Sequence, residues 1–249
     1  MSENQASLKN RVAVVTGAGS GIGKALSVGL AEAGASICCA ARTASKLEET
    51  VSEINDKGGK AISIATDVTD YDSVKTLFNF ARDSFGGVDI TIINAGKGSN
   101  GHQSIEDGDP AEWQETIKTN LTGAYFTAKA AIPCLKESSS GKIILMGSGT
   151  GYRSVPNASA YACSKSGLWM LTRSLAWELL PYDICVNELI PGPVKTDMTA
   201  DLEEFFNSKM GRSEWFKRPE DVVPLAIFLA TQPNKGPTGQ SFGLNRREL

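Results

Sequence analysis

The feature that most constrains how this chain can fold is a regular alternation of short apolar runs with longer helical patterns. Most of the apolar runs are continuous and rich in β-branched residues, which is typical of strands covered on both faces. The sequence therefore predicts an α/β fold with a doubly wound, parallel, seven-stranded sheet flanked by helices. We expect strands at 11–17, 36–41, 61–67, 88–96, 142–148, 183–190 and 240–244, and helices at 22–33, 44–57, 70–85, 110–136, 158–180 and 219–231.

Length and charge narrow the domain organisation and the partners. The 249 residues contain no internal repeat, low-complexity tract or linker, so we expect a single domain over 1–249. The formal net charge is −3, without the basic excess that nucleic acid or an anionic membrane attracts. We therefore expect a small-molecule substrate, with no nucleic-acid partner and no membrane partner.

The cysteines and the N-terminus indicate a compartment. There are five cysteines and no C-x-x-C pair, so we expect buried, reduced thiols, including Cys163. Cys38 and Cys39 are neighbours in an expected strand and should point to opposite faces. The first ten residues are polar, with no apolar signal core, and no apolar stretch reaches the roughly 18 residues of a bilayer span. The predicted location is cytoplasmic.

The stretch "TGAGSGIGKA", residues 16–25, joins the first expected strand to the first expected helix. Glycines there let backbone N–H groups approach a phosphate, and the helix N-terminus favours negative charge. A P-loop is excluded, because Ala18 and Ala25 stand where it needs Gly and Ser or Thr. The pattern G-x-G-x-x-G also fails, because Ile22 takes the last glycine position. What fits is T-G-x-x-x-G-I-G, with Gly17, Gly21 and Gly23.

That pattern resembles the cofactor turn of the short-chain dehydrogenase/reductase family, and the resemblance extends from Arg11 to about Leu244. It implies a Rossmann-fold oxidoreductase that uses a nicotinamide cofactor to interconvert a ketone or aldehyde and an alcohol. By pattern the chain is most similar to 3-oxoacyl-carrier-protein reductases and general carbonyl reductases. The cofactor-binding residues that the resemblance implies, together with Arg42, are Gly17, Gly19, Ser20, Gly21, Ile22, Gly23, Asp67, Val68, Asn94, Ala95, Gly96, Tyr161, Lys165, Pro191, Gly192, Val194 and Thr196.

The end of the second expected strand bears on the choice between NAD and NADP. Folds that bind NAD usually place an Asp or Glu about 20 residues past the glycines, where it bonds the ribose 2′-hydroxyl. Here Ala41 takes the position where NAD-preferring relatives place Asp, and Arg42 follows it. An arginine can hold a 2′-phosphate with two parallel hydrogen bonds. The sequence therefore predicts a preference for NADP(H), with NAD(H) still possible.

Tyr161 and Lys165 lie four residues apart at the start of an expected helix, so they share one face. Carbonyl reduction needs a proton donor, and a nearby ammonium makes a tyrosine able to cycle its proton by favouring the phenolate. The spacing matches the family's Y-x-x-x-K motif. The resemblance implies that Ser148 holds the substrate oxygen and that Asn120 holds a water linking Lys165 to a proton relay. Asn120, Ser148, Tyr161 and Lys165 are thus the expected catalytic residues, and we expect no metal.

Two other functions stay open at this stage. One is an NAD-dependent polyol or sugar alcohol dehydrogenase that runs in the oxidative direction. The other is a non-catalytic sensor or scaffold that binds the cofactor without turnover.

Several exposed-looking features have no assigned role. His102 is the only histidine and lies in a polar loop, where we expect a surface position rather than a catalytic one. The segment 203–216 could cover the substrate or be a surface helix. Arg153 could contact an anionic substrate or only solvent. The pair Arg246–Arg247 could contact an anionic substrate, a neighbouring subunit or only solvent. The resemblance also implies a homo-oligomer, a tetramer or a dimer, through the helices expected at 110–136 and 158–180.

Overall fold

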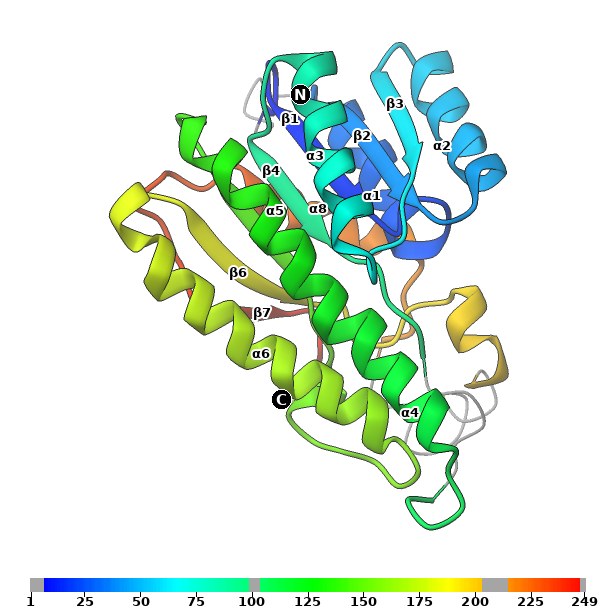
Figure 1. Cartoon of the computed structure of the whole chain (residues 1–249). Coiled ribbons are helices and arrows are strands. Elements are labelled where there is room, and N and C mark those ends of the chain that lie inside the picture. Colours follow the sequence, from blue (N-terminus) through cyan, green and yellow to red (C-terminus); the bar gives the residue numbers. More distant parts are fainter. Residues whose placement is uncertain (1–6, 99–103, 203–214, 247–249) are drawn as a thin grey trace.

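The computed structural model of the chain describes residues 7–98, 104–202 and 215–246. All seven expected strands are present and form one parallel sheet in the order β3-β2-β1-β4-β5-β6-β7 (Figure 1). The strands begin and end within a few residues of their expected limits, because the polar residues at their carboxyl ends belong to the loops. The strands are β1 Val12–Thr16, β2 Ser36–Ala41, β3 Lys60–Ala65, β4 Ile90–Ile93, β5 Lys142–Met146, β6 Cys185–Ile190 and β7 Ser241–Gly243.

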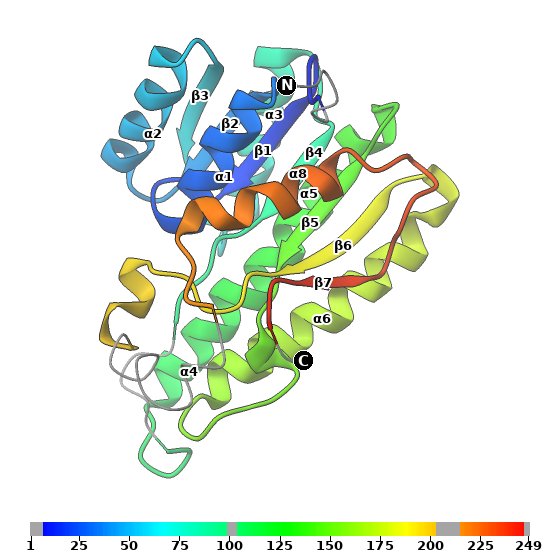
Figure 2. The same ribbon diagram turned by 180° about the vertical axis from the view of Figure 1, so that it is seen from behind.

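Helices cover both faces of the sheet. α3, α5 and α6 lie on the face seen in Figure 1, and α1 and α8 lie on the opposite face, seen in Figure 2. Among the described residues, none of these helices is long and apolar enough to cross a membrane. The helices are α1 Gly21–Glu32, α2 Ala44–Asp56, α3 Tyr71–Phe85, α4 Pro110–Ile117, α5 Gly123–Glu137, α6 Ser159–Leu179 and α8 Val223–Ala230.

The core consists of two apolar layers, one on each side of the sheet. Cys38 and Cys39 belong to different layers, as expected for neighbours in a strand. Burial raises the pKa of the Cys38 thiol to about 12 and that of Cys39 to about 11, so both are inert side chains of the core. The expectation for Cys163 is wrong, because this thiol is exposed.

The helix expected over 110–136 is not continuous. A π-helical turn, Lys118–Thr122, separates α4 from α5 and contains the buried Asn120. This interruption was not predicted, because it accompanies side-chain bonds between residues that lie far apart in the sequence. Side-chain bonds of Asn120 to the neighbouring loop, described below, stabilise the wider turn, and such turns often mark functional sites. The helix expected over 219–231 likewise opens with a 3₁₀ turn, Pro219–Val222, before α8.

The strand order reverses between β1 and β4, which are neighbours in the sheet although β2 and β3 lie between them in the chain. In open parallel sheets the helices that leave such a point go to opposite faces, and a crevice opens at the carboxyl ends of the strands. The expected site residues follow β1, β2, β3, β4, β5 and β6, so the topology brings them to this one edge.

Candidate active site

The glycine turn between β1 and α1 has a backbone that only glycine fits. Gly17 and Gly21 have positive φ values of 69° and 52°. A Cβ on Gly23 would lie 2.1 Å from the Gly17 carbonyl oxygen. The end of β4 supports the turn, because the Asn94 side-chain amide donates to the Thr16 carbonyl at 3.0 Å and the Ala95 amide donates to Thr16 Oγ1 at 3.2 Å. The expected residues Asn94 and Ala95 therefore shape the turn itself.

Two helix N-termini face this crevice without side-chain caps. α1 is preceded by Ser20 and α2 by Thr43, and neither side chain makes a capping hydrogen bond. The first N–H groups of both helices are thus available to an external acceptor, and the helix dipole favours an anion there. A dinucleotide with a pyrophosphate and a 2′-phosphate supplies acceptors of this charge.

A cavity of about 200 Å³ lies between the glycine turn and the ends of β2, β3 and β4. Asp67 lines it and accepts a hydrogen bond from the Thr69 amide, which lowers the pKa of the carboxyl, with a smaller effect from the charges of Arg42 and Lys118. Arg42 is exposed at the mouth. The lining brings together eight expected cofactor residues, and Ala41 and Lys46 line it as well. The eight are Gly17, Gly19, Ser20, Arg42, Asp67, Val68, Ala95 and Gly96.

Ser148 follows β5 and begins a 3₁₀ turn, Gly149–Gly151, in which the Thr150 amide donates to Ser148 Oγ at 3.2 Å. This turn packs directly on α6. Ser166 Oγ donates to the Gly151 carbonyl at 2.6 Å, and a Cβ on Gly151 would lie 2.8 Å from the Lys165 carbonyl carbon. The structure therefore places the Ser148 turn against the part of α6 that carries Tyr161 and Lys165.

Tyr161 and Lys165 lie in the first two turns of α6, on one face. Lys165 Nζ lies 5.6 Å from the centre of the Tyr161 ring and donates to the Met146 carbonyl at 2.7 Å. Lys165 is only 6% exposed, while Tyr161 is half-buried. A buried ammonium beside a phenol that ligands can reach is the arrangement that the spacing of the two residues predicts.

Asn120 joins the loop after β4 to α6. Its side-chain oxygen accepts from the Lys97 amide at 2.8 Å, and its nitrogen donates to the Lys97 carbonyl at 3.0 Å and to Ser164 Oγ at 3.1 Å. Ser164 Oγ in turn donates to the Tyr161 carbonyl at 2.7 Å. The side chain of Asn120 thus bonds to the loop after β4 and, through Ser164, to the first turn of α6.

The loop after β6 reaches back to the glycine turn. Val194 is buried, and a Cβ on Gly21 would lie 3.1 Å from Thr196 Cγ2. Pro191 is also buried, and Gly192 has a positive φ of 66°. The expected residues of 191–196 thus lie at the same edge of the sheet as the glycine turn.

Sequence reasoning missed two residues beside this loop, Lys217 and Asn245. The buried Lys217 pairs its backbone with the loop, donating to the Pro193 carbonyl at 3.0 Å. A Cβ on Gly192 would lie 2.7 Å from Asn245 Oδ1, so the segment after β7 passes beside this loop. The position of Asn245 at the end of the last strand was the only signal that could have indicated it.

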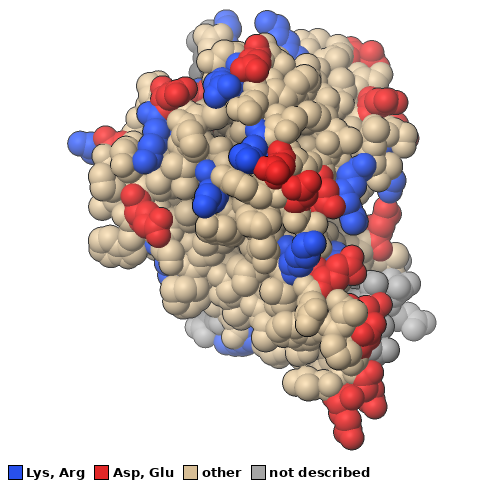
Figure 3. Space-filling view, in the orientation of Figure 1, with Lys and Arg blue, Asp and Glu red and all other residues tan. Residues whose placement is uncertain are grey.

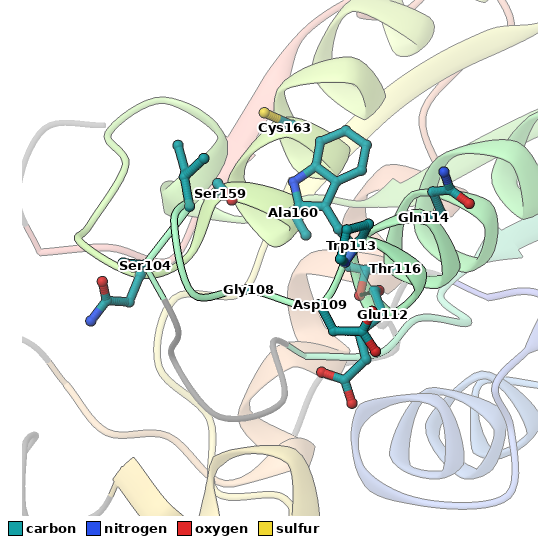
Figure 4. A pocket seen from close by; sticks show the side chains of 13 residues that line it. Ser104, Gly108, Asp109, Glu112, Trp113, Gln114, Thr116, Ser159, Ala160 and Cys163 are labelled. Atoms are coloured by element: carbon teal, nitrogen blue, oxygen red, sulfur yellow. Dashed lines mark hydrogen bonds between the residues drawn. The ribbon is translucent and has the colours of Figure 1, made fainter.

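A second cavity, of about 490 Å³, lies between α4, the loop before it and the first turn of α6 (Figure 4). Trp113 of α4 points its indole toward Ala160 and Cys163 of α6. Cys163 is two residues from Tyr161 and therefore points away from the Tyr161–Lys165 face, which explains its exposure. This cavity is separate from the one that holds the expected cofactor residues.

The remaining candidates are exposed or lie outside the described residues. Arg153 and Arg246 are exposed. His102, Arg247 and nearly all of 203–216 lie outside the residues that the structure describes. Within the described part of the chain, no group of three His, Cys, Asp or Glu residues could hold a metal ion.

A doubly wound parallel sheet with a glycine turn and a helix N-terminus at its switch point defines a dinucleotide-binding class of protein. A model of the short chain dehydrogenase family matches residues 11–206. The chain is 35% identical over 245 residues to trans-4-hydroxycyclohexanecarboxylate dehydrogenase of Sinomonas cyclohexanicum, and this alignment covers 96% of this chain and 92% of that protein. The chain belongs to the short-chain dehydrogenase/reductase family and is an oxidoreductase.

Solved structures agree with this membership. A short-chain type dehydrogenase/reductase from Mycobacterium marinum matches with a TM-score of 0.90 and 32% identity, over 96% of each chain. A protein of Beutenbergia cavernae, assigned as an NAD(P) dependent gluconate 5-dehydrogenase and carrying NADP at low occupancy, matches with a TM-score of 0.89 and 32% identity, over 96% of this chain and 97% of that one.

Proposed function

We propose that this oxidoreductase transfers a hydride between NADP(H) and a small carbonyl or alcohol substrate, with the whole chain, 1–249, as one cofactor-binding domain. The observation that carries the proposal is the position of Tyr161 beside the buried Lys165, on a helix that packs against the Ser148 turn. The cofactor supplies or takes up the hydride when it is bound. The residues of the chain must then supply the proton and hold the substrate oxygen.

Each of the four catalytic candidates has a role that its contacts permit. Tyr161 is the general acid and base, and the ammonium of Lys165 stabilises its phenolate. Ser148 donates a hydrogen bond to the substrate oxygen. Asn120 fixes the first turn of α6 through Ser164 and the loop through Lys97, so that Tyr161 keeps its position. Its expected role of holding a water that links Lys165 to a proton relay stays a prediction.

The residues present fit a nicotinamide dinucleotide, and those around α2 favour the phosphorylated form. Position 41 offers no carboxylate to a ribose 2′-hydroxyl, Arg42 and Lys46 line the cavity, and the uncapped N-terminus of α2 lies next to them. A related protein carries NADP. These features support NADP(H) as the preferred cofactor, with NAD(H) as the weaker ligand.

Arg42→Ala tests the cofactor preference. A hydrogen-bonded charge pair contributes about 1.5–3 kcal/mol, so we expect NADPH affinity to fall roughly 10- to 100-fold while NADH affinity changes less than about two-fold. Fluorescence titration of the purified protein with each cofactor measures this. Arg153→Ala, which removes an exposed arginine outside the cavity, is the control. Tighter binding of NADH than NADPH, unaffected by Arg42→Ala, would instead favour an NAD-dependent polyol or sugar alcohol dehydrogenase.

The names of two relatives suggest where to search for the substrate. One acts on a hydroxycyclohexanecarboxylate and the other is assigned to gluconate, so both names concern hydroxy acids. We propose hydroxy acids and their keto forms as the first substrate panel, followed by neutral ketones and alcohols. Tight cofactor binding without turnover on the whole panel would favour the sensor or scaffold.

We also propose that the chain forms a homo-oligomer, a dimer or a tetramer, through α5 and α6. Trp177 on α6 is 77% exposed, and Met170, seven residues before it, lies on the same helical face and is also exposed. Tyr125 on α5 and Tyr182 after α6 add further exposed rings. Charges of both signs are interspersed over this side, with uncharged surface between them (Figure 3). Exposed large apolar side chains on neighbouring helices, such as these, typically mark a protein interface.

Trp177→Glu tests this interface. A buried charge without a partner is costly, so we expect the variant to elute at a lower molar mass than the wild type in size-exclusion chromatography with light scattering. Ile105→Glu is an equally drastic change at an exposed apolar residue. It lies in the loop before α4, beside the first turn of α6 and not beside its last turn where Trp177 lies, and it should leave the mass unchanged. A wild-type chain that elutes as a monomer, or a Trp177→Glu variant of unchanged mass, would contradict the proposal.

The five cysteines are free, which fits a reducing compartment such as the cytoplasm.

A further inference from the structure

Glu188 is a completely buried carboxylate that the proposed chemistry does not use. It lies on β6 and faces α6, on the same side as the apolar Val186 and Ile190. In the described residues no Lys or Arg forms an ion pair with it. A buried carboxylate is costly unless hydrogen bonds compensate it, so its contacts indicate what it does there.

One carboxylate oxygen of Glu188 receives two hydroxyl groups. Tyr152 Oη donates to Oε2 at 2.5 Å and Ser241 Oγ donates to it at 2.6 Å. Burial, and next the hydrogen bond to Glu188, raise the pKa of Tyr152 to about 12, so this hydroxyl remains a proton donor. Arg173 completes the cluster by donating to Ser241 Oγ at 3.4 Å and stacking on Trp169.

The other carboxylate oxygen of Glu188 lies against Gly147. A Cβ built on Gly147 would lie 2.1 Å from Oε1, and this oxygen has no hydrogen-bond partner among the described residues. The Gly147 amide donates to the Leu189 carbonyl on β6 at 2.8 Å. Glu188 therefore contacts the chain on both sides of Ser148, at Gly147 directly and at Tyr152 through its hydroxyl.

The turn that these contacts fix is the one that carries Ser148. Its far side is attached to α6 by the bond from Ser166 to the Gly151 carbonyl. Met146, just before Gly147, accepts from Lys165. The turn is thus attached to α6 on one side and to Glu188 of β6 on the other, and together these attachments set the position of Ser148 relative to Tyr161.

We propose that Glu188 and Tyr152 are positioning residues that hold the Ser148 turn in its productive position. They act through Ser148 and touch neither substrate nor cofactor. This inference rests on the proposed function for the role of Ser148. It explains why a carboxylate, rather than a third aliphatic side chain, occupies this face of β6.

The kinetic test uses Tyr152→Phe, which removes the hydroxyl and keeps the ring that packs edge-on against Trp169. We expect kcat to fall about ten-fold in the otherwise wild-type enzyme and less than two-fold in a Ser148→Ala background, because contacts that act through one residue are not additive. The dissociation constant of NADPH should not change. Glu188→Gln keeps an acceptor for Tyr152 and should retain most of the activity, whereas Glu188→Ala should behave like Tyr152→Phe.

Tyr71→Phe on α3 is the matched control and should leave kcat unchanged. An equal loss from Tyr152→Phe in both backgrounds would overturn the proposal, because the effect would then not pass through Ser148. So would a folded Tyr152→Phe variant with wild-type kcat.

A second measurement does not depend on turnover. Hydrogen–deuterium exchange of the amides in 147–152 should be at least ten-fold faster in Tyr152→Phe than in the wild type or Tyr71→Phe, with the glycine turn at 16–25 unaffected. Unchanged exchange overturns the proposal whatever the activity. If exchange rises while Ser148→Ala leaves kcat at the wild-type value, the proposed role of Ser148 fails and the positioning of the turn stands.

Discussion

Replacing Tyr161 by Phe should lower kcat/KM about 10³-fold with any substrate that the wild-type chain turns over. A positioned general acid contributes roughly 10²–10⁴-fold, and the phenol hydroxyl is the proton donor that the geometry of α6 offers. The ring of the variant still fits the half-buried site, so the NADPH dissociation constant should change less than three-fold. Steady-state kinetics and a fluorescence titration of the same preparation measure the two quantities.

The comparison with Tyr71→Phe separates the loss of this hydroxyl from a general effect of losing one. Tyr71 lies on α3 and packs on Phe126, away from the glycine turn and α6. A Tyr161→Phe variant that keeps more than a third of the wild-type kcat/KM would refute Tyr161 as the proton donor. A large loss of NADPH affinity in that variant would show instead that the hydroxyl mainly binds the cofactor.

The strands could be predicted because their cause is local. The stretches 37–40 and 143–146 are unbroken apolar runs, and each is buried on both faces as that pattern predicts. The order of the strands could not be obtained in this way, because periodicity does not say which strand lies next to which. The resemblance implied a doubly wound sheet, and the pairing of β1 with β4 shows where the strand order reverses.

The residues of the candidate site likewise divide into those that the sequence could predict and those that depend on contacts between distant residues. Gly17, Tyr161 and Lys165 stand out because the chemistry of phosphate binding and proton transfer needs those residue types at those spacings. The π-helical turn around Asn120 did not stand out, because side-chain bonds to Lys97, 23 residues earlier in the sequence, accompany it. In the sequence Glu188 is one of two polar residues, with Asn187, in an otherwise apolar strand. The proposed role of Glu188 could not be predicted, because it depends on hydrogen bonds from Tyr152 and Ser241, which are 36 and 53 residues away.

The second large effect is expected at Gly23, in the glycine turn. Alanine at this position would place a methyl group 2.1 Å from the Gly17 carbonyl oxygen and 2.5 Å from the Asn94 side-chain nitrogen. Both neighbours must move, and Asn94 then loses its bonds to the carbonyls of Thr16 and Gly17. We expect Gly23→Ala to lower the free energy of unfolding by about 2–3 kcal/mol, measured by urea denaturation.

The same substitution should also weaken NADPH binding. The N–H groups of the turn and of the first turn of α1 bind a phosphate only if the Gly17 backbone keeps its positive φ and its distance from α1. We expect the NADPH dissociation constant to rise at least 100-fold at a temperature where the variant is still folded. Gly87→Ala is the matched control, because nothing lies within 4 Å of a Cβ there, and both quantities should stay at their wild-type values. If Gly23→Ala binds NADPH as the wild type does, phosphate binding does not depend on this turn, and the cofactor must be held elsewhere along the edge of the sheet.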